Sequence, residues 1–128
     1  MNTAFTTTTT APQSVSVRIA GDLDYETIDE LVDVGSQLLT QQNELSDLHL
    51  DFRETTFVDS AALSGLLLLH RRTTQAGIEL HLVRRPPFLD RVLQVTGLFG
   101  HFVPADDAAN DGDPNSVGQA SSGEARAR

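Results

Sequence analysis

The 128-residue sequence contains no cysteine, no tryptophan and no lysine, and these absences exclude several classes of function. Without cysteine, the chain can form no disulfide, offer no thiolate to a metal and use no cysteine nucleophile. No apolar run approaches the ~18–20 residues that cross a bilayer, so we expect no membrane-spanning helix. The first residues form neither a basic start nor an apolar stretch. We therefore expect no secretory signal and predict a cytoplasmic protein.

Cations are scarce as well. Eighteen acidic residues against nine basic ones, all of them arginine, give a formal net charge of −9. A surface of this sign repels nucleic-acid phosphates and anionic lipid headgroups, so we predict neither a nucleic acid nor a membrane as partner. The single tyrosine and the lack of tryptophan also leave few aromatic platforms on which unpaired bases could stack.

The length and a hydrophobic content of 39% are enough for one globular domain, which we place at residues 14–105. Residues 106–128 have too few apolar side chains to offset the entropy of ordering, which predicts a disordered acidic tail. Residues 1–13 form an N-terminal segment with a candidate edge strand, because its run of threonines favours extended backbone. A break at Pro12 would fold that strand back as a hairpin.

Strand and helix patterns alternate through the middle of the chain. Alternating apolar residues predict strands at residues 15–19, 48–52, 78–82 and 101–103. Apolar residues three and four apart predict helices at residues 28–39, at residues 60–76 and from Pro86-Pro87 to Gly97. Asp24 or Thr27 is expected to cap the first helix. Four consecutive leucines, Leu66 to Leu69, predict that the second helix is buried on more than one face.

This alternation predicts an α/β fold. We expect a mixed, mostly parallel sheet of four to five strands in a single domain, with right-handed crossovers. Because the strands alternate instead of being apolar throughout, one face of the sheet should be poorly covered. The helices should therefore lie mainly on the other face.

The segment that can carry chemistry begins at Asp59-Ser60, where a strand leads into the leucine-rich helix. A serine in the first turn of a helix faces free backbone N–H groups and the positive end of the helix dipole. A phosphate there would add about −1.5 to −2 charges and could accept several N–H hydrogen bonds. The same dipeptide also fits an ordinary N-cap, so a switch and a cap both remain open.

Several motifs in order along the chain resemble those of a STAS domain. They are Gly21-Asp22-Leu23-Asp24, Leu50-Asp51-Phe52, Phe57-Val58-Asp59-Ser60, Ala76-Gly77-Ile78-Glu79-Leu80 and Val95-Thr96-Gly97-Leu98. The resemblance covers about residues 14–105 and is greatest to the anti-sigma-factor antagonists of bacteria. It implies that an anti-sigma factor, itself a serine kinase, phosphorylates Ser60. The unmodified protein would bind this kinase, the phosphorylated form would release it, and a PP2C-type phosphatase would reset the cycle.

The resemblance also implies a partner-binding surface around the serine. Its residues here are Asp22, Asp24, Asp59, Ser60, Ala61, Leu63 and Ser64. The family typically reads Asp-Ser-Ser/Thr-Gly-Leu-Gly, whereas Ala61-Ala62-Leu63-Ser64 follows Ser60 here, which adds a Cβ where a kinase loop must approach. Two alternatives therefore stay open within the same fold, namely a non-phosphorylated scaffold and an accessory subunit of a transporter.

A small serine hydrolase is the alternative from another class. Ser60 would be the nucleophile, His81 or His101 the base, and Asp22 or Asp90 the group that orients the base. The Gly-x-Ser-x-Gly elbow that exposes such a serine is missing, so we do not predict an enzyme.

Two histidines raise the question of a metal. His49 and His81 should point away from the core, and they would be neighbours if their strands were adjacent. With no cysteine and no third ligand at helical or hairpin spacing, we predict no metal site. The glycines form no phosphate-binding loop or dinucleotide fingerprint, so we expect no cofactor.

Overall fold

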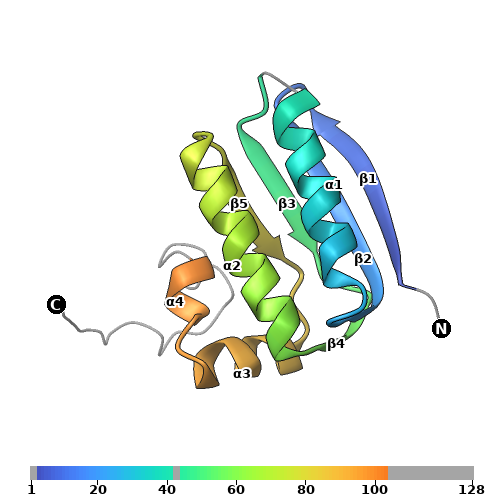
Figure 1. Cartoon of the computed structure of the whole chain (residues 1–128), viewed down its shortest axis with the longest axis vertical. Helices are drawn as coiled ribbons and strands as arrows, with labels where there is room; N and C mark the ends of the chain where they lie inside the picture. The colour runs from blue at the N-terminus through green and yellow to red at the C-terminus, as the bar shows by residue number, and fades with distance from the viewer. Residues whose placement is uncertain (1–2, 42–43, 104–128) are drawn as a thin grey trace, which may run out of the picture. The chain divides into compact units, whose positions relative to one another are not determined.

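The computed structural model describes residues 3–41 and 44–103, and these divide into two compact units between Arg91 and Val92. The predicted tail, residues 106–128, lies outside the described residues. The first unit holds β1 (Ala4–Ala11), β2 (Ser14–Leu23), α1 (Ile28–Gln41), β3 (Asp47–Asp51), β4 (Thr55–Val58), α2 (Ser60–Gln75) and β5 (Glu79–Val83) (Figure 1). The short helix α3 (Pro87–Val95) crosses the division, and α4 (Phe99–Phe102) lies in the second unit. None of the described helices is long and apolar enough to span a bilayer.

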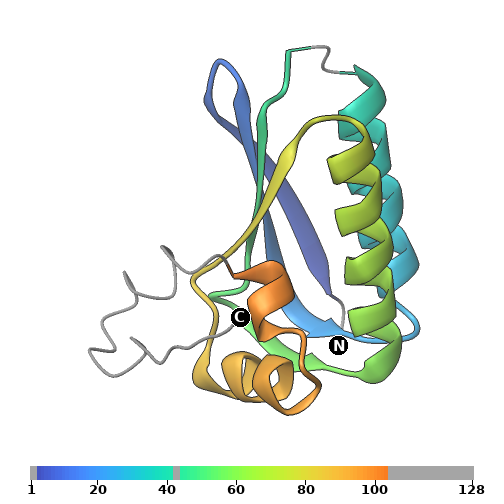
Figure 2. The same ribbon diagram turned by 90° about the vertical axis from the view of Figure 1, so that its left-hand side faces the viewer.

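The five strands form one sheet in the order β1-β2-β3-β5, and β4 pairs with the end of β2. β1 runs antiparallel to β2, whereas the pairs β2–β3, β2–β4 and β3–β5 are parallel. The predicted α/β fold with a mixed, mostly parallel sheet is confirmed, and so is the threonine-rich edge strand with its hairpin. Figure 2 shows α1 and α2 side by side on one face of the sheet, as expected.

The core of the first unit lies between the sheet and these two helices. Apolar side chains of β2 and β3 alternate into it, and residues such as Val17, Ile19 and Leu50 are fully buried. From the helices, Leu31 and Leu66 fill the same layer. Because side chains alternate along a strand, the residues between these positions point to the opposite, open face of the sheet, and they are polar.

Two glycines let α1 and α2 approach each other closely. A Cβ at Gly65 would lie 2.2 Å from Cγ1 of Ile28, and a Cβ at Gly35 would lie 2.7 Å from a terminal methyl of Leu69. Both values are far below ordinary van der Waals contact. The crossing of the two helices therefore depends on the absence of a side chain at these points.

Two predictions made from the sequence are wrong. The predicted strand at residues 101–103 is wrong, because Phe99–Phe102 forms the single helical turn α4, in which the N–H of Val103 donates to the C=O of Phe99. A run of three apolar-rich residues is too short to distinguish strand from helix by pattern. Of the four leucines, only Leu66 and Leu69 are buried, whereas Leu67 and Leu68 are half-buried. Successive helical residues point about 100° apart, so four in a row cannot all face one core.

Candidate functional site

Ser60 is the first residue of α2, and it is exposed. The residue that caps the helix is Asp59, whose backbone is extended and whose Oδ1 accepts a hydrogen bond of 2.8 Å from the N–H of Ala62. Within the described residues, the Ser60 hydroxyl makes no hydrogen bond. The sequence left open whether this dipeptide is a helix cap or a phosphorylation site. The structure assigns the cap to Asp59, and it leaves Ser60 with an exposed hydroxyl.

Asp59 also ties the neighbouring loop to this helix end. Its Oδ2 accepts from the N–H of Tyr25 at 3.0 Å, and its own N–H donates to the C=O of Leu23 at 3.3 Å. The parallel pairing of Leu23 with Val58 brings the ends of β2 and β4 together just before these contacts. The loop after β2 is therefore held beside Ser60.

Asp24 and Asp22 play different parts in that loop. Asp24 Oδ1 accepts from the N–H groups of Glu26 and Thr27 in the turn that leads into α1, while the Thr27 hydroxyl accepts from the N–H of Asp24. This reciprocal arrangement confirms Asp24 as a cap, one of the two that we predicted. Asp22 is exposed, and its Oδ1 accepts a 2.6 Å hydrogen bond from the hydroxyl of Thr56 in β4.

The remaining predicted contact residues lie on α2 with different exposure. Ser64 is exposed, one helical turn beyond Ser60 and on the same face. Ala61 is half-buried, and Leu63 is buried in the core. Leu63 therefore supports the helix from below and presents little surface to a partner.

Two aromatic residues at this end of the sheet were missed by sequence reasoning. Tyr25 is 70% exposed, and Phe57, which pairs in register with Asp22, is 49% exposed. Exposed aromatic side chains beside polar groups are the residues that most often anchor protein–protein contacts. The only signal in the sequence was that Phe57 belongs to the motif Phe57-Val58-Asp59-Ser60, which does not indicate how exposed its side chain is.

Asp59→Ala is expected to lower the free energy of unfolding by about 0.5–2 kcal/mol, the usual cost of losing an N-cap. Ser60→Ala should change it by less than about 0.5 kcal/mol, because the hydroxyl is exposed. Urea denaturation measures both, and Asp59→Asn, which keeps an acceptor for Ala62, is the control. Equal losses for Asp59→Ala and Ser60→Ala would contradict this division of roles.

The sequence model described as "Mlab, STAS domain" matches residues 6–104. The chain belongs to the STAS domain family. An anti-sigma factor antagonist from Mycobacterium paratuberculosis is similar in structure, with a TM-score of 0.65 at 18% identity, over 88% of this chain and 96% of that one. The Bacillus cell fate determinant SpoIIAA in its phosphorylated form has a TM-score of 0.62 at 21% identity, over 84% of this chain and 98% of that one. A sulfate transporter family protein from Wolinella succinogenes has a TM-score of 0.56 at 16% identity, over 74% of this chain and 75% of that one. These likenesses confirm the expected STAS fold.

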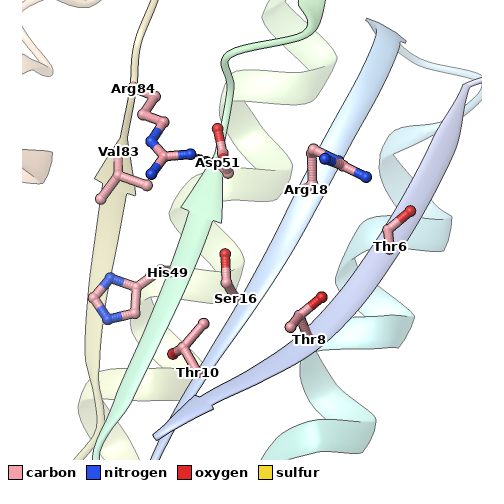
Figure 3. A pocket seen from close by; sticks show the side chains of 9 residues that line it. All are labelled: Thr6, Thr8, Thr10, Ser16, Arg18, His49, Asp51, Val83 and Arg84. Atoms are coloured by element: carbon pink, nitrogen blue, oxygen red, sulfur yellow. Dashed lines mark hydrogen bonds and ion pairs between the residues drawn. The ribbon is translucent and has the colours of Figure 1, made fainter.

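The open face of the sheet in this STAS domain carries a groove of about 440 Å³ (Figure 3). It is lined by Thr6, Thr8, Thr10, Ser16, Arg18, His49, Asp51, Val83 and Arg84. Asp51 is buried, and it accepts hydrogen bonds from the N–H of Arg53 at 2.9 Å and from the guanidinium of Arg84 at 3.3 Å. The aspartate of the Leu50-Asp51-Phe52 motif therefore has a structural partner of opposite charge.

The two strand histidines are neighbours, as we predicted for adjacent strands. His49 and His81 are register partners, and their rings stack with centroids 4.6 Å apart. His81 Nε2 lies 2.9 Å from Oδ1 of Asp47, and this hydrogen bond holds the pKa of Asp47 below its usual value. Burial is the larger cause of the lowered pKa of His49, and the nearby His81 lowers that pKa further.

The hydrolase alternative required His81 or His101 and Asp22 or Asp90 to serve Ser60. His81 is instead hydrogen-bonded to Asp47, on the open face of the sheet. Asp90 forms an ion pair of 2.6 Å with Arg85, whose guanidinium also donates to the C=O of Leu82. Both groups are thus engaged in contacts that do not involve Ser60.

Proposed function

We propose that this STAS domain is an anti-sigma-factor antagonist that binds an anti-sigma serine kinase and is released when that kinase phosphorylates Ser60. The observation that carries the proposal is the separation of roles at the start of α2. Because Asp59 caps the helix, the Ser60 hydroxyl is exposed and makes no hydrogen bond to any residue that the structure describes. A kinase can therefore reach it, and its modification need not unfold the helix.

The surface around Ser60 suits a protein partner. Tyr25 and Phe57 offer exposed aromatic area, while Asp22 and Ser64 add polar groups. The nearby carboxylates make this end of the sheet acidic, so the complementary surface of the kinase should be basic. The likeness in fold to two anti-sigma factor antagonists supports the assignment.

Phosphorylation would act at the centre of this contact. The phosphate brings about −1.5 to −2 charges next to the Asp59 carboxylate, which is already present. Like charges repel, and the dianion must also lose water when the partner docks. The phosphorylated form would therefore dissociate, and a PP2C-type phosphatase would restore binding. Such a cycle requires ATP, so we expect the protein to act in the cytoplasm.

The direct test is mass spectrometry after incubation with ATP and candidate anti-sigma kinases. We expect one added phosphate, located on Ser60, and none in Ser60→Ala. Ser64→Ala is the matched control, because Ser64 is an exposed serine on the same face of α2 and should leave the modification unchanged. Phosphate on another residue, or no transfer from any kinase that binds the protein, would overturn the proposal.

A second candidate is an accessory subunit of a transporter that binds without phosphorylation. It is favoured by Ala61-Ala62-Leu63-Ser64, which departs from the pattern of the antagonists, and by the likeness in fold to a sulfate transporter family protein. Copurification from cells separates the two candidates. A transporter component retained equally by the parent and by Ser60→Asp would favour this one.

A further inference from the structure

An acid–leucine–histidine tripeptide occurs twice, on two adjacent parallel strands. Asp47-Leu48-His49 begins β3, and Glu79-Leu80-His81 begins β5. The strands pair so that Asp47 lies beside Glu79 and His49 beside His81. Because alternate residues share a face, the two acids and the two histidines form two adjacent pairs on the open face of the sheet.

Three of these side chains converge on one point. His81 Nε2 lies 2.9 Å from Asp47 Oδ1 and 3.9 Å from Glu79 Oε1, and ligand atoms of the three residues all lie within 4.8 Å of one another. Neighbouring ligands of a tetrahedral zinc ion are about 3.3 Å apart, given bonds of about 2.0–2.2 Å. The observed separations lie on both sides of this value, so side-chain rotation without backbone movement could complete the site.

No arginine neutralises the two acids within the described residues, whereas Asp51 and Asp90 each pair with one. Asp51 pairs with Arg84, and Asp90 pairs with Arg85. Across the part of the chain that the structure describes, no arginine pairs with Asp47 or Glu79. Among the described residues, the partner that they share is His81, which carries a positive charge only when it is protonated. Beside a neutral His81 the two carboxylates repel each other, and a bound divalent ion would relieve that repulsion.

Packed strands hold the backbone of this site in place, while the Glu79 side chain, 78% exposed, can rotate toward it. Leu48, between Asp47 and His49, is fully buried on the opposite side of the strand, and Leu82 next to His81 is also buried. The stacked ring of His49 limits the movement of His81 on one side. Ligands placed on packed strands lose little conformational freedom when an ion binds.

We propose that Asp47, Glu79 and His81 form a binding site for a divalent transition-metal ion such as Zn²⁺. One imidazole nitrogen and two carboxylates suit zinc and its neighbours better than Mg²⁺, which prefers oxygen ligands only. The site lies at the start of β3 and β5, whereas Ser60 follows the end of β4. It is therefore independent of the proposed function.

Calorimetric titration of the untagged, metal-free full chain with ZnCl₂ tests the site. We expect one Zn²⁺ per chain, a rise in melting temperature on binding, and no heat with MgCl₂ under the same conditions. His81→Ala should reduce affinity at least tenfold, and Glu79→Gln should also weaken it. The Glu79 side chain is 78% exposed, so Glu79→Gln should fold even if His81→Ala does not.

The controls separate this site from adventitious binding. His70→Gln removes a histidine from α2 and should leave the affinity unchanged, and Ser60→Ala should bind zinc like the parent. Weak binding at several sites per chain, or an affinity that neither Glu79→Gln nor His81→Ala alters, would overturn the proposal. The absence of any heat with Zn²⁺ at millimolar concentration would do the same.

Discussion

Ser60→Asp is expected to bind the anti-sigma kinase at least about 30-fold more weakly than the parent, whereas Ser60→Ala should bind constitutively. A charge left unpaired at the centre of an interface costs about 2–5 kcal/mol. That cost corresponds to a dissociation constant raised about 30-fold to 4,000-fold. Aspartate carries one charge instead of about 1.5–2, so it should reach the lower end of this range. Titration calorimetry with the purified kinase measures the difference.

Ser64→Asp provides the matched control for charge alone. It places the same carboxylate on the same exposed face of α2, one turn farther from Asp59 and from the ends of β2 and β4. A general effect of acidity would weaken binding equally in both variants, whereas a contact centred on Ser60 predicts a much smaller loss for Ser64→Asp. If Ser60→Asp and Ser60→Ala both bound like the parent, Ser60 would not be the switch, and the STAS fold would stand.

Gly65→Ala is expected to destabilise the domain by about 2 kcal/mol even though alanine is the better helix former. Replacing glycine within a helix gains about 1 kcal/mol of intrinsic propensity. Against this, the new Cβ would lie 2.2 Å from Cγ1 of Ile28, a β-branched residue whose rotamer is fixed by its own helix. Overpacking of this kind costs about 1–3 kcal/mol, and an overlap this severe should cost about 3 kcal/mol or more. The gain in helix propensity offsets only part of that cost.

Thermal unfolding checks this prediction. A loss of about 2 kcal/mol corresponds to a fall of about 8–16 °C in melting temperature for a domain of this size. Gly100→Ala is the control, because a Cβ there would meet nothing within 4 Å. Gly35→Ala should lower the melting temperature by an amount between those of Gly65→Ala and Gly100→Ala, because the new Cβ would meet the terminal methyl groups of Leu69. A Gly65→Ala protein as stable as the parent would show that α1 and α2 can separate at little cost.

Much of the fold could be predicted because its signals are local. The alternation of Val15, Val17 and Ile19 marks a strand with one buried face, whatever its neighbours are. The order of strands and helices then restricts the sheet to a few topologies. The error at residues 101–103 arose where this local signal was shortest, so the hydrogen bonds of α4 could not be anticipated.

The site could be located from the sequence, but its division of labour could not. The dipeptide Asp59-Ser60 is compatible with either residue as the cap, and only the backbone geometry decides between them. The exposure of Tyr25 and Phe57 depends on where the helices end over the sheet, which no local pattern records. Glu79, a ligand of the proposed metal site, was missed for a similar reason. It joins Asp47 only through the register of two strands that are far apart in sequence.

The separation of the cap from the exposed hydroxyl has a consequence for how the proposed signal would be observed. With Asp59 closing the helix in either state, the two forms would differ in charge while sharing one backbone. Circular dichroism and melting curves would then scarcely distinguish them, whereas native electrophoresis or ion exchange would separate them readily. The pace of signalling would be set by the two opposing enzymes and by dissociation of the complex, because no refolding step would intervene.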